Sequence, residues 1–525
     1  MNVIDKAISI FDPQTALKRQ VARAKLDIIA KGYSQHGASR TDKALKEWPT
    51  DSGNVDEDIH DNLDILVKRS RDLYYGANIG TGAIKSTRTN VIGSGLKCKP
   101  KIDKTVLNLT DEEALKWNEK TEKEFALWGD SVHCDAQRMN NFGEIQQLAF
   151  VTWLVEGDTF ALLPYIPRKQ LPYDLRVQLI EPSRVSNPSF IGRGGKDKNV
   201  KRGVIRGKHG EVVAYYIANR EGEGYDRTIK HKKIWKYGKE SGRTNVVHAM
   251  ESERVGQVRG LPFLTPVIKS IKQLTRYTNA EITAAVIAAY FTVFIENKSM
   301  DSGGALGSEG GNGEFYEEAD QDTGDNSSEQ AEYKLGSGAI IELEEGQTVK
   351  DVNPGRQNSS FDAFIKSMCN QIGAALEIPS DILLKAFNKS YSASRAAMLE
   401  AWKMYKMRRT WMANDFCQPI YEEFLTEAIT KGRIKAPGFF RDPLIRKAYC
   451  NAEWIGPSPG QIDPVKEVNA AIKRVDNGFT TREQETTALN GGSFRDNIEA
   501  AKWETQQMKE SGLKEEVNAE KVLGN

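Results

Sequence analysis

The chain lacks the residue spacings on which the common enzyme active sites depend. No G-x-x-x-x-G-K-[ST] phosphate loop occurs, and the nearest stretch, Gly192–Lys198 (GRGGKDK), has the wrong spacing and favours a surface loop. The six histidines are spread out without an H-E-x-x-H pair, so a metal site is not expected. No G-x-S-x-G nucleophile elbow is present, and the GSG stretches at Gly93–Gly95 and Gly336–Gly338 suit turns. The sequence therefore predicts a protein that is not an enzyme and that holds no cofactor or metal.

Two further features could suggest catalysis or cofactor binding, but the sequence around them does not support either interpretation. His248 lies near Glu253 and Arg254, but no orienting Asp and nucleophile are evident with it. A lone histidine at a strand end is more often structural, so we expect a structural role. The glycines between Gly76 and Gly82 follow no predicted strand and have the wrong spacing for a dinucleotide site.

The chemistry that the sequence does offer is a small basic loop, Pro379–Tyr391, between two predicted helices. The cationic and polar side chains of this loop and of the helix before it are Lys385, Asn388, Lys389, Ser390 and Lys366. Such side chains can contact DNA phosphates without reading bases, in contacts that weaken with salt. In a single copy the loop is only weakly basic, and a solvated loop is the simpler interpretation. Trp402, Tyr405 and Trp411 could form a base-stacking platform, but their helical spacing favours core packing.

Two helices must position this loop. The first is predicted at Phe361–Leu376, because its apolar residues recur at three- and four-residue steps, and Pro379 then ends it. The second is predicted to begin near Ser392–Ser394, where serines can cap it, and to end at Gly432. Pro419 lies inside the second helix and is expected to kink it.

The chain before this pair predicts a mainly helical α+β protein. Helices are expected at Ile59–Tyr75, Ala77–Val91, Thr110–Trp128 and Asn141–Leu154. Thr110 and Glu113 have the spacing of a capping box. Short apolar or β-branched runs predict strands of a small mixed β region at Thr159–Ile166, Leu175–Ile180, Gly203–Ile205, Val212–Ala218 and one or two places between Ile234 and Met250. Leu264–Glu296 carries a continuous apolar stripe, with Pro266 in its first turn, and predicts one helix of about 30 residues.

The amino-acid composition changes after this helix. Met300–Glu332 holds seven glycines and ten acidic residues without Lys or Arg, a composition that predicts disorder. Ala339–Leu343 predicts a strand. Nearer the C-terminus, Asp463 before Pro464 predicts the start of a helix, Thr480 and Glu483 are expected to cap the next one, and Ser493–Lys514 predicts a last charged helix.

Composition narrows the class of protein. The 73 Lys and Arg residues nearly balance 72 Asp and Glu residues, so the total charge favours a surface along which DNA slides over one that holds DNA tightly. The five cysteines are odd in number and form no C-x-x-C pair, which favours a reduced cytosol. The most apolar run, Ile282–Ile295, is too short to span a bilayer, so no membrane partner is expected. Residues Ala16–Lys31 predict either a basic amphipathic helix or an arm that orders on assembly.

Several stretches of the sequence, in order along the chain, resemble the portal proteins of tailed phages, lambda type. The quoted stretches are RSRDLYYGANIGTGAIKSTRTNVIGSGLKCKP (Arg69–Pro100), QLIEPSRVSNP (Gln178–Pro188), IGAALEIPSDILLKAFNKSYSASRAAMLEAWK (Ile372–Lys403), FCQPIYEEFLTEAI (Phe416–Ile429) and WIGPSPGQIDPVKE (Trp454–Glu467). The resemblance covers the chain from about Asp51 to about Gly478. Several matching segments in the same order as in the family indicate the family more specifically than any one motif does.

The resemblance implies a division into portal parts. These are an N-terminal arm (1–50), a wing of helices and sheet (51–262), a first stem helix (263–297), a small β clip containing the acidic insert (298–357), a second stem helix (358–378), a tunnel loop (379–391), a long kinked wing helix (392–436) and a helical crown (437–525). The long acidic insert departs from the compact clip that the family leads us to expect.

The resemblance also implies a function. Portal subunits form a ring, usually a dodecamer, at one vertex of the capsid, where it meets the capsid or scaffold protein. The ring docks the large terminase subunit during packaging, lets double-stranded DNA pass, and afterwards holds the head–tail connector. The protein would be assembled in the host cytoplasm and become part of the virion. Repeated around such a ring, Lys385 and Lys389 would form a belt of positive charge facing DNA.

Two other classes of protein stay open at this point. One is a different head–tail connector ring, against which the predicted order of helix, strand and helix argues. The other is a DNA-processing enzyme, against which the missing phosphate loop and carboxylate cluster argue. Metal-dependent cleavage or ATP turnover would revive the second alternative.

Overall fold

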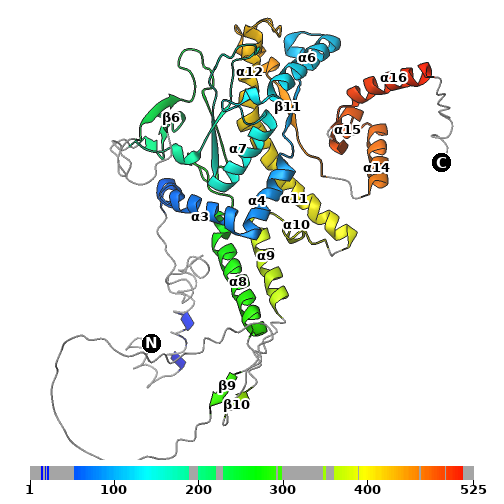
Figure 1. The fold of residues 1–525 in the computed structure, drawn as a ribbon. Coiled ribbons are helices and arrows are strands. Elements are labelled where there is room, and N and C mark those ends of the chain that lie inside the picture. The colour runs from blue at the N-terminus through cyan, green and yellow to red at the C-terminus, as the bar shows by residue number, and fades with distance from the viewer. Residues whose placement is uncertain are drawn as a thin grey trace, which may run out of the picture. The chain divides into compact units, whose positions relative to one another are not determined.

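The structure is a computed structural model that describes residues 14, 15, 18, 21, 22, 53–188, 199–219, 229–290, 294–297, 347–350, 360–387, 390–459, 463–490 and 492–511 (Figure 1). The predictions for the insert at 300–332, for the strand Ala339–Leu343, and for most of Ala16–Lys31 therefore lie outside the described residues. The chain divides into two units, residues 1–61 and 62–525. In the first unit a π-helical turn spans Asp56–His60, and His60 Nδ1 lies 2.7 Å from Asp56 Oδ1.

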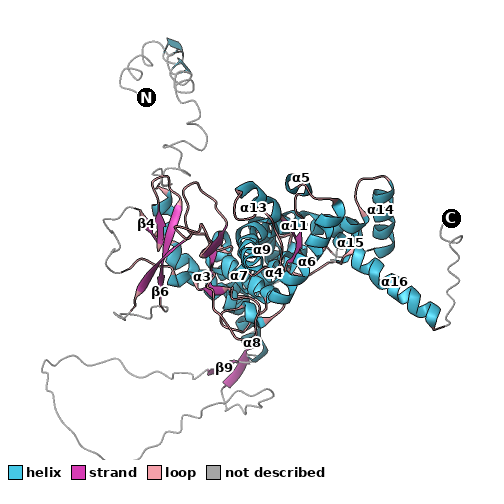
Figure 2. Cartoon of the chain, turned by 90° about the horizontal axis from the view of Figure 1, so that it is seen from above, coloured by secondary structure: helices cyan, strands magenta, loops and turns pink. Residues whose placement is uncertain are grey.

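The second unit is mainly helical, as predicted, with short strands (Figure 2). Its α-helices are α3 (Leu63–Gly76), α4 (Asn78–Val91), α5 (Lys104–Leu107), α6 (Asp111–Gly129), α7 (Phe142–Glu156), α8 (Ile268–Tyr290), α9 (Phe361–Ala375), α10 (Ser380–Leu383), α11 (Tyr391–Met412), α12 (Gln418–Thr430), α13 (Pro443–Tyr449), α14 (Pro464–Asp476), α15 (Arg482–Asn490) and α16 (Phe494–Glu510). Its strands are β1 (Lys97–Pro100), β2 (Asp158–Leu162), β3 (Gln178–Ile180), β4 (Val200–Lys201), β5 (Val204–Arg206), β6 (Val212–Ala218), β7 (His231–Trp235), β8 (Val246–Met250), β9 (Phe294–Asn297), β10 (Gln347–Lys350) and β11 (Ala452–Ile455).

Local cap chemistry places several helix ends where the sequence predicts them. Thr110 and Glu113 form the capping box of α6, and Asp463 caps α14 with Pro464 in the first turn. The predicted cap of α15 is wrong by one residue: Gln484 N donates to Thr481 Oγ1, and Thr481 N donates to Gln484 Oε1. Thr480 with Glu483 and Thr481 with Gln484 both have the spacing of a capping box, so spacing alone does not decide which pair caps the helix.

The described strands of the β region pair antiparallel, and the prediction of a mixed β region is wrong; an isolated bridge between Asp135 and Val177 is parallel. A three-stranded sheet has the order β3-β2-β8 and a four-stranded sheet has the order β4-β5-β6-β7, with every strand pair antiparallel. Parallel strands need a crossover of a dozen or more residues, and β4, β5 and β6 follow one another too closely for one. A further pair joins β1 to β11, which are about 350 residues apart in sequence.

One aromatic cluster joins the helices of the core. The Phe125 ring of α6 lies 5.1–6.0 Å from rings on α6, α7, α12 and β11, which belong to Trp128, Phe142, Tyr421, Phe424 and Trp454. All but Trp454 of these side chains are almost completely buried. Aromatic pairs add stability beyond their buried area, so this cluster fixes α12 against the N-terminal helices.

A buried ion pair ties the two sheets together. Arg259 donates to both carboxylate oxygens of Asp158 at the start of β2, and to the carbonyl oxygens of Pro182, Val185 and Arg202 at 2.9–3.0 Å. Burial alone would raise the pKa of Asp158, but Arg259 and His248 lower it to about 2. The carboxylate is therefore charged and paired, and we call this group of interactions the Asp158–Arg259 clamp.

His248 belongs to this clamp, which agrees with the structural role expected for it. Its ring stacks on Phe160 with centroids 4.1 Å apart, and its Nε2 lies 3.5 Å from Asp158 Oδ2. Tyr215 Oη lies 3.2 Å from its Nδ1. Burial lowers the pKa of His248, so the ring is neutral near pH 7.

The predicted helix Leu264–Glu296 is shorter than expected at both ends. Thr265–Val267 forms a 3-10 turn, α8 follows, and Phe294–Asn297 pairs antiparallel with Gln347–Lys350 as β9 and β10. Apolar aromatic and β-branched residues suit either a helix or a strand, and a strand partner some 50 residues later decides the outcome. α8 and α9 lie side by side, with the Tyr277 ring 5.7 Å from that of Phe361 and 4.7 Å from that of Phe364 (Figure 1).

The long helix after the loop changes its hydrogen-bond pattern before Pro419. A π-helical turn at Ala413–Cys417 separates α11 from α12. Proline cannot donate to the carbonyl four residues earlier, and the wider turn accommodates it. The helix ends at Thr430, slightly before the predicted stop at Gly432.

All five cysteines are buried free thiols. Burial raises the pKa of the Cys134 and Cys450 thiols to about 12. Among the helices that the structure describes, none combines the length and apolarity needed to cross a membrane.

Candidate nucleic-acid interface

The turn after α9 sets the base of the basic loop. Ile378 N donates to Gly373 O at 2.8 Å, and Glu377 between them adopts the left-handed region with φ 57°. A Cβ atom on Gly373 would lie 2.4 Å from Ile378 O, so only glycine allows this close return of the chain. Ile378 is itself buried and fastens the turn to the core.

A short helix that the sequence did not predict occupies the first part of the loop. Pro379 precedes α10, and the side chains of Asp381 and Leu383 are buried. Lys385 then adopts a left-handed conformation with φ 53°, while Ala386 N donates to Asp381 O at 3.0 Å. This turn ends α10 and leaves the Lys385 side chain exposed.

The structure describes three of the five predicted DNA-contacting residues. Lys385 and Ser390 are both exposed, on either side of Asn388 and Lys389, which lie outside the described residues. The prediction that serines at Ser392–Ser394 cap the second helix is wrong, because α11 begins at Tyr391 and these serines lie inside it. Ser390 precedes its first turn and makes no side-chain cap; its Oγ lies 3.2 Å from Ser392 Oγ.

Lys366 differs from the other predicted contacts. It lies on α9, is 62% exposed, and forms an ion pair with Asp362 one turn earlier. The spacing of four residues could have revealed this pairing from sequence. Because the pair is exposed it is weak, yet it offsets the charge that Lys366 would present to a phosphate.

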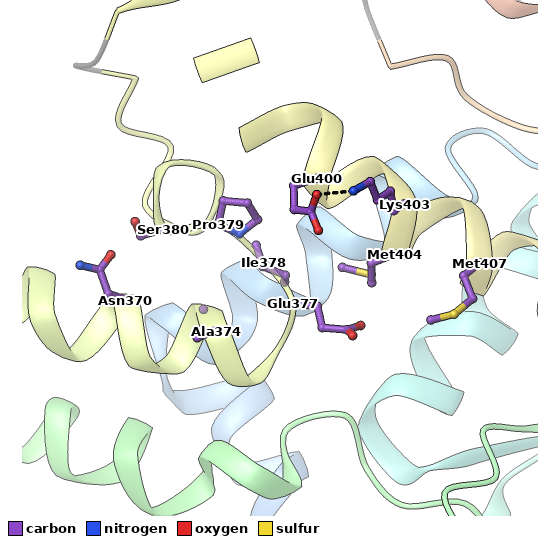
Figure 3. A pocket seen from close by; sticks show the side chains of 11 residues that line it. Asn370, Ala374, Glu377, Ile378, Pro379, Ser380, Glu400, Lys403, Met404 and Met407 are labelled. Atoms are coloured by element: carbon purple, nitrogen blue, oxygen red, sulfur yellow. Dashed lines mark hydrogen bonds and ion pairs between the residues drawn. The ribbon is translucent and has the colours of Figure 1, made fainter. Parts of the chain in front are cut away.

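An open pocket lies beside the base of the loop, between the end of α9 and α11 (Figure 3). Its volume is about 570 Å³, and its lining includes Ile378, Pro379, Met404 and Met407. Figure 3 shows both methionine side chains pointing from α11 toward the Glu377–Pro379 turn. Its polar lining residues are Asn370, Glu377, Ser380, Glu400 and Lys403.

Arg408 connects α11 to the base of the loop and to the strand region. Its Nη2 lies 3.4 Å from Glu251 Oε2, and its Nη1 lies 3.8 Å from Glu377 Oε2. The guanidinium stacks 4.7 Å from the Phe263 ring, and the side chain is only 7% exposed. This role could not be predicted from the sequence, because the three partners are distant from Arg408 in the chain.

Two glutamates fix α12 to the strand region. Glu423 accepts from Thr244 N at 2.8 Å and from Arg243 Nε at 3.2 Å. Glu427 accepts from Asp174 N at 2.6 Å and from Leu175 N at 2.9 Å. Burial raises the pKa of Glu423, although Thr244 and Arg243 lower it in part. These bonds hold the far end of the helix that follows the loop.

The alternative base-stacking platform is wrong, because its aromatic rings are used in packing. Tyr405 is 2% exposed, and Trp402 and Trp411 pack against the main core. Arg409 lies over the Trp402 ring at 5.1 Å, and it donates to Val91 O and Asn90 O.

Comparison with known proteins identifies the class. A family profile described as "Phage portal protein, lambda family" matches residues 41–409, which is more than half of the chain. The chain therefore belongs to the lambda family of phage portal proteins, which are structural, non-enzymatic components of the virion.

The chain is also similar to individual portal proteins and to one solved chain. The chain is 25% identical to portal protein B of Escherichia phage lambda over 503 residues, covering 91% of this chain and 90% of the relative. It is 23% identical to the portal protein of Escherichia phage N15 over 488 residues, covering 89% of each. Among solved structures, a chain from the neck of an empty gene transfer agent particle, computed with C6 symmetry, aligns with a TM-score of 0.43 and 12% identity over 81% of this chain and 92% of that chain.

Proposed function

We propose that this chain forms a ring at one capsid vertex through which double-stranded DNA enters and leaves. The ring, a homododecamer, docks the large terminase subunit during packaging and the head–tail connector afterwards, and it meets the major capsid or scaffold protein. The observation that carries the proposal is the match to the portal family over residues 41–409. The proposal places ATP hydrolysis in the partner, and the chain itself serves as a passive conduit.

Each proposed part would include some of the described elements. The wing (51–262) contains α3 to α7 and both sheets, and α8 is the first stem helix. The clip (298–357) contains β10, which pairs with β9 at the end of the stem segment. The second stem helix is α9, the tunnel loop is 379–391, the wing helix is α11 with α12, and the crown (437–525) contains α13 to α16.

Lys385, Asn388, Lys389 and Ser390 are the proposed DNA contacts of the tunnel loop. The exposed Lys385 side chain supports this, because its turn is anchored by buried neighbours while its charge stays in solvent. Contacts of lysine with phosphate are independent of sequence and weaken steeply with salt, which suits a surface that DNA must slide past. Lys366 is a weaker proposed contact, because Asp362 already offsets its charge.

A packaging assay with purified rings tests this assignment. The variant is Lys385→Asn with Lys389→Asn, since asparagine tolerates the left-handed conformation of residue 385 better than alanine does. We expect rings of normal appearance by electron microscopy, a reduced yield of packaged DNA, and an altered salt dependence of packaging. The matched control, Lys366→Gln, should change packaging less. Unchanged packaging by the loop variant across a range of salt would contradict the assignment of the DNA contacts.

A further inference from the structure

Among the described side chains of the tunnel loop, Phe387 is the large apolar one that is exposed to water. It is 53% exposed and lies two residues after Lys385, in a segment whose other proposed task is to face a hydrated polyanion. A benzene ring gains nothing from a phosphate backbone, whereas its burial in an apolar site is favourable. Phe387 is not among the residues that line the pocket between α9 and α11 of its own chain, which we call the α9–α11 pocket.

The α9–α11 pocket has the chemistry that suits an aromatic ring. Ile378, Met404 and Met407 line it, and methionine sulfur makes favourable contacts with aromatic rings. Its volume of about 570 Å³ leaves room for a phenyl group. Met407 lines the apolar part of the pocket and is 39% exposed, so the pocket in the single chain leaves apolar surface in water.

We propose that Phe387 of one copy inserts into the α9–α11 pocket of the neighbouring copy in the ring. This rests on the proposed ring function. Ile378 immediately precedes the loop and Pro379 begins it, and both line the pocket, so in every subunit the pocket lies only a few residues along the chain from Phe387. Rotation about a ring axis keeps equivalent residues at the same level, and a head-to-tail contact of this kind closes on itself.

The charges of the two surfaces are complementary. Between Leu384 and Ser390 the loop carries two lysines and no carboxylate. The pocket rim carries two carboxylates and one lysine: Glu377, which is 59% exposed and lies 3.8 Å from Arg408 Nη1, and Glu400, which pairs with Lys403 at 2.6 Å. Opposite charges at a rim steer the approach of two surfaces and fix their register more than they add to affinity.

Cysteine cross-linking tests the insertion directly. In the full-length chain, Phe387→Cys is combined with Met407→Cys and oxidised under mild conditions; the five native thiols are buried. We expect a ladder of covalent multimers on a non-reducing gel. The matched control combines Phe387→Cys with Leu399→Cys, a more exposed position on the same helix outside this pocket, and should form few multimers. Each single variant supplies the background.

The outcomes separate this inference from the ring itself. Three outcomes would overturn the insertion but not the proposal of a ring. These are rings in electron micrographs without the ladder, equal ladders from both cysteine pairs, and a faster-migrating monomer as the only product. Monomers without rings would overturn both proposals. As a second measurement, Phe387→Ala should shift ring dissociation to about tenfold higher protein concentration or more, and Phe387→Leu should restore most of the stability. Equal dissociation of all three proteins would also overturn the insertion.

Discussion

Replacing Arg259 by methionine should open the sheet region locally while leaving most of the chain folded. Arg259 is 5% exposed and donates to a carboxylate and three carbonyl oxygens, and all of these hydrogen bonds are lost in the variant. Breaking a buried pair by removing one partner costs about 3–5 kcal/mol, because the remaining charge stays buried. The contribution of the ionised Asp158 alone, from a pKa lowered to about 2, is about 2 kcal/mol near pH 7.

The pH dependence of this effect has a definite sign. Because the pKa of Asp158 is lowered in the folded state, its stabilisation is present above about pH 4 and is lost as the pH falls toward 2. In Arg259→Met the same carboxyl group is buried without its cation, so burial raises its pKa. The deficit of the variant should therefore shrink as the pH falls, because protonated Asp158 carries no charge.

Amide hydrogen exchange of β2 and β8 measures this opening in the assembled protein. A loss of 3 kcal/mol or more corresponds to exchange about 100-fold faster or more in these strands. The control is Arg184→Met, since Arg184 donates to Ala218 O without a buried carboxylate partner and should cost about 1 kcal/mol. Equal effects of the two variants, or a deficit for Arg259→Met that grows at low pH, would refute the reasoning.

Two further predictions concern single side chains. Gly373→Ala should destabilise the protein, because the new Cβ would lie 2.4 Å from Ile378 O. Gly82→Ala, in the interior of α4 where no atom lies near the new Cβ, should stabilise the protein by about 0.5–1 kcal/mol. Thermal melting of both variants should show opposite changes in stability. Burial, together with the neighbouring Glu181, raises the pKa of Glu156 to about 8. The folded chain then holds a proton that the unfolded chain releases near pH 4–5, so wild-type stability should fall between about pH 5 and 8. Glu156→Gln should lose most of this slope in melts across that range, and an unchanged slope would contradict the assignment.

Features that depend on neighbouring residues were predictable from sequence. The capping box of Thr110 and Glu113 and the Asp463 cap are complete within four residues, and the periodicity of α9 is local. The candidate loop was also visible, because lysines between two amphipathic helices need no tertiary partner to be recognised.

Features that depend on distant partners were not predictable. The strand Phe294–Asn297 exists because Gln347–Lys350 pairs with it, and periodicity cannot show that partner. The role of Arg259 depends on Asp158, about 100 residues earlier. In the loop, the exposed ring of Phe387 and the pocket beside Met407 acquire meaning only when three-dimensional exposure is known.

An electron cryomicroscopy reconstruction of the purified protein tests the central claim most directly. The account predicts closed rings, with α9 of every subunit alongside a central hole and with Lys385 and Ser390 facing that hole. Closed rings in which Lys385 lies on the outer surface would contradict the DNA-contact assignment. A protein that stays monomeric over a range of salt and concentration would contradict the conduit itself.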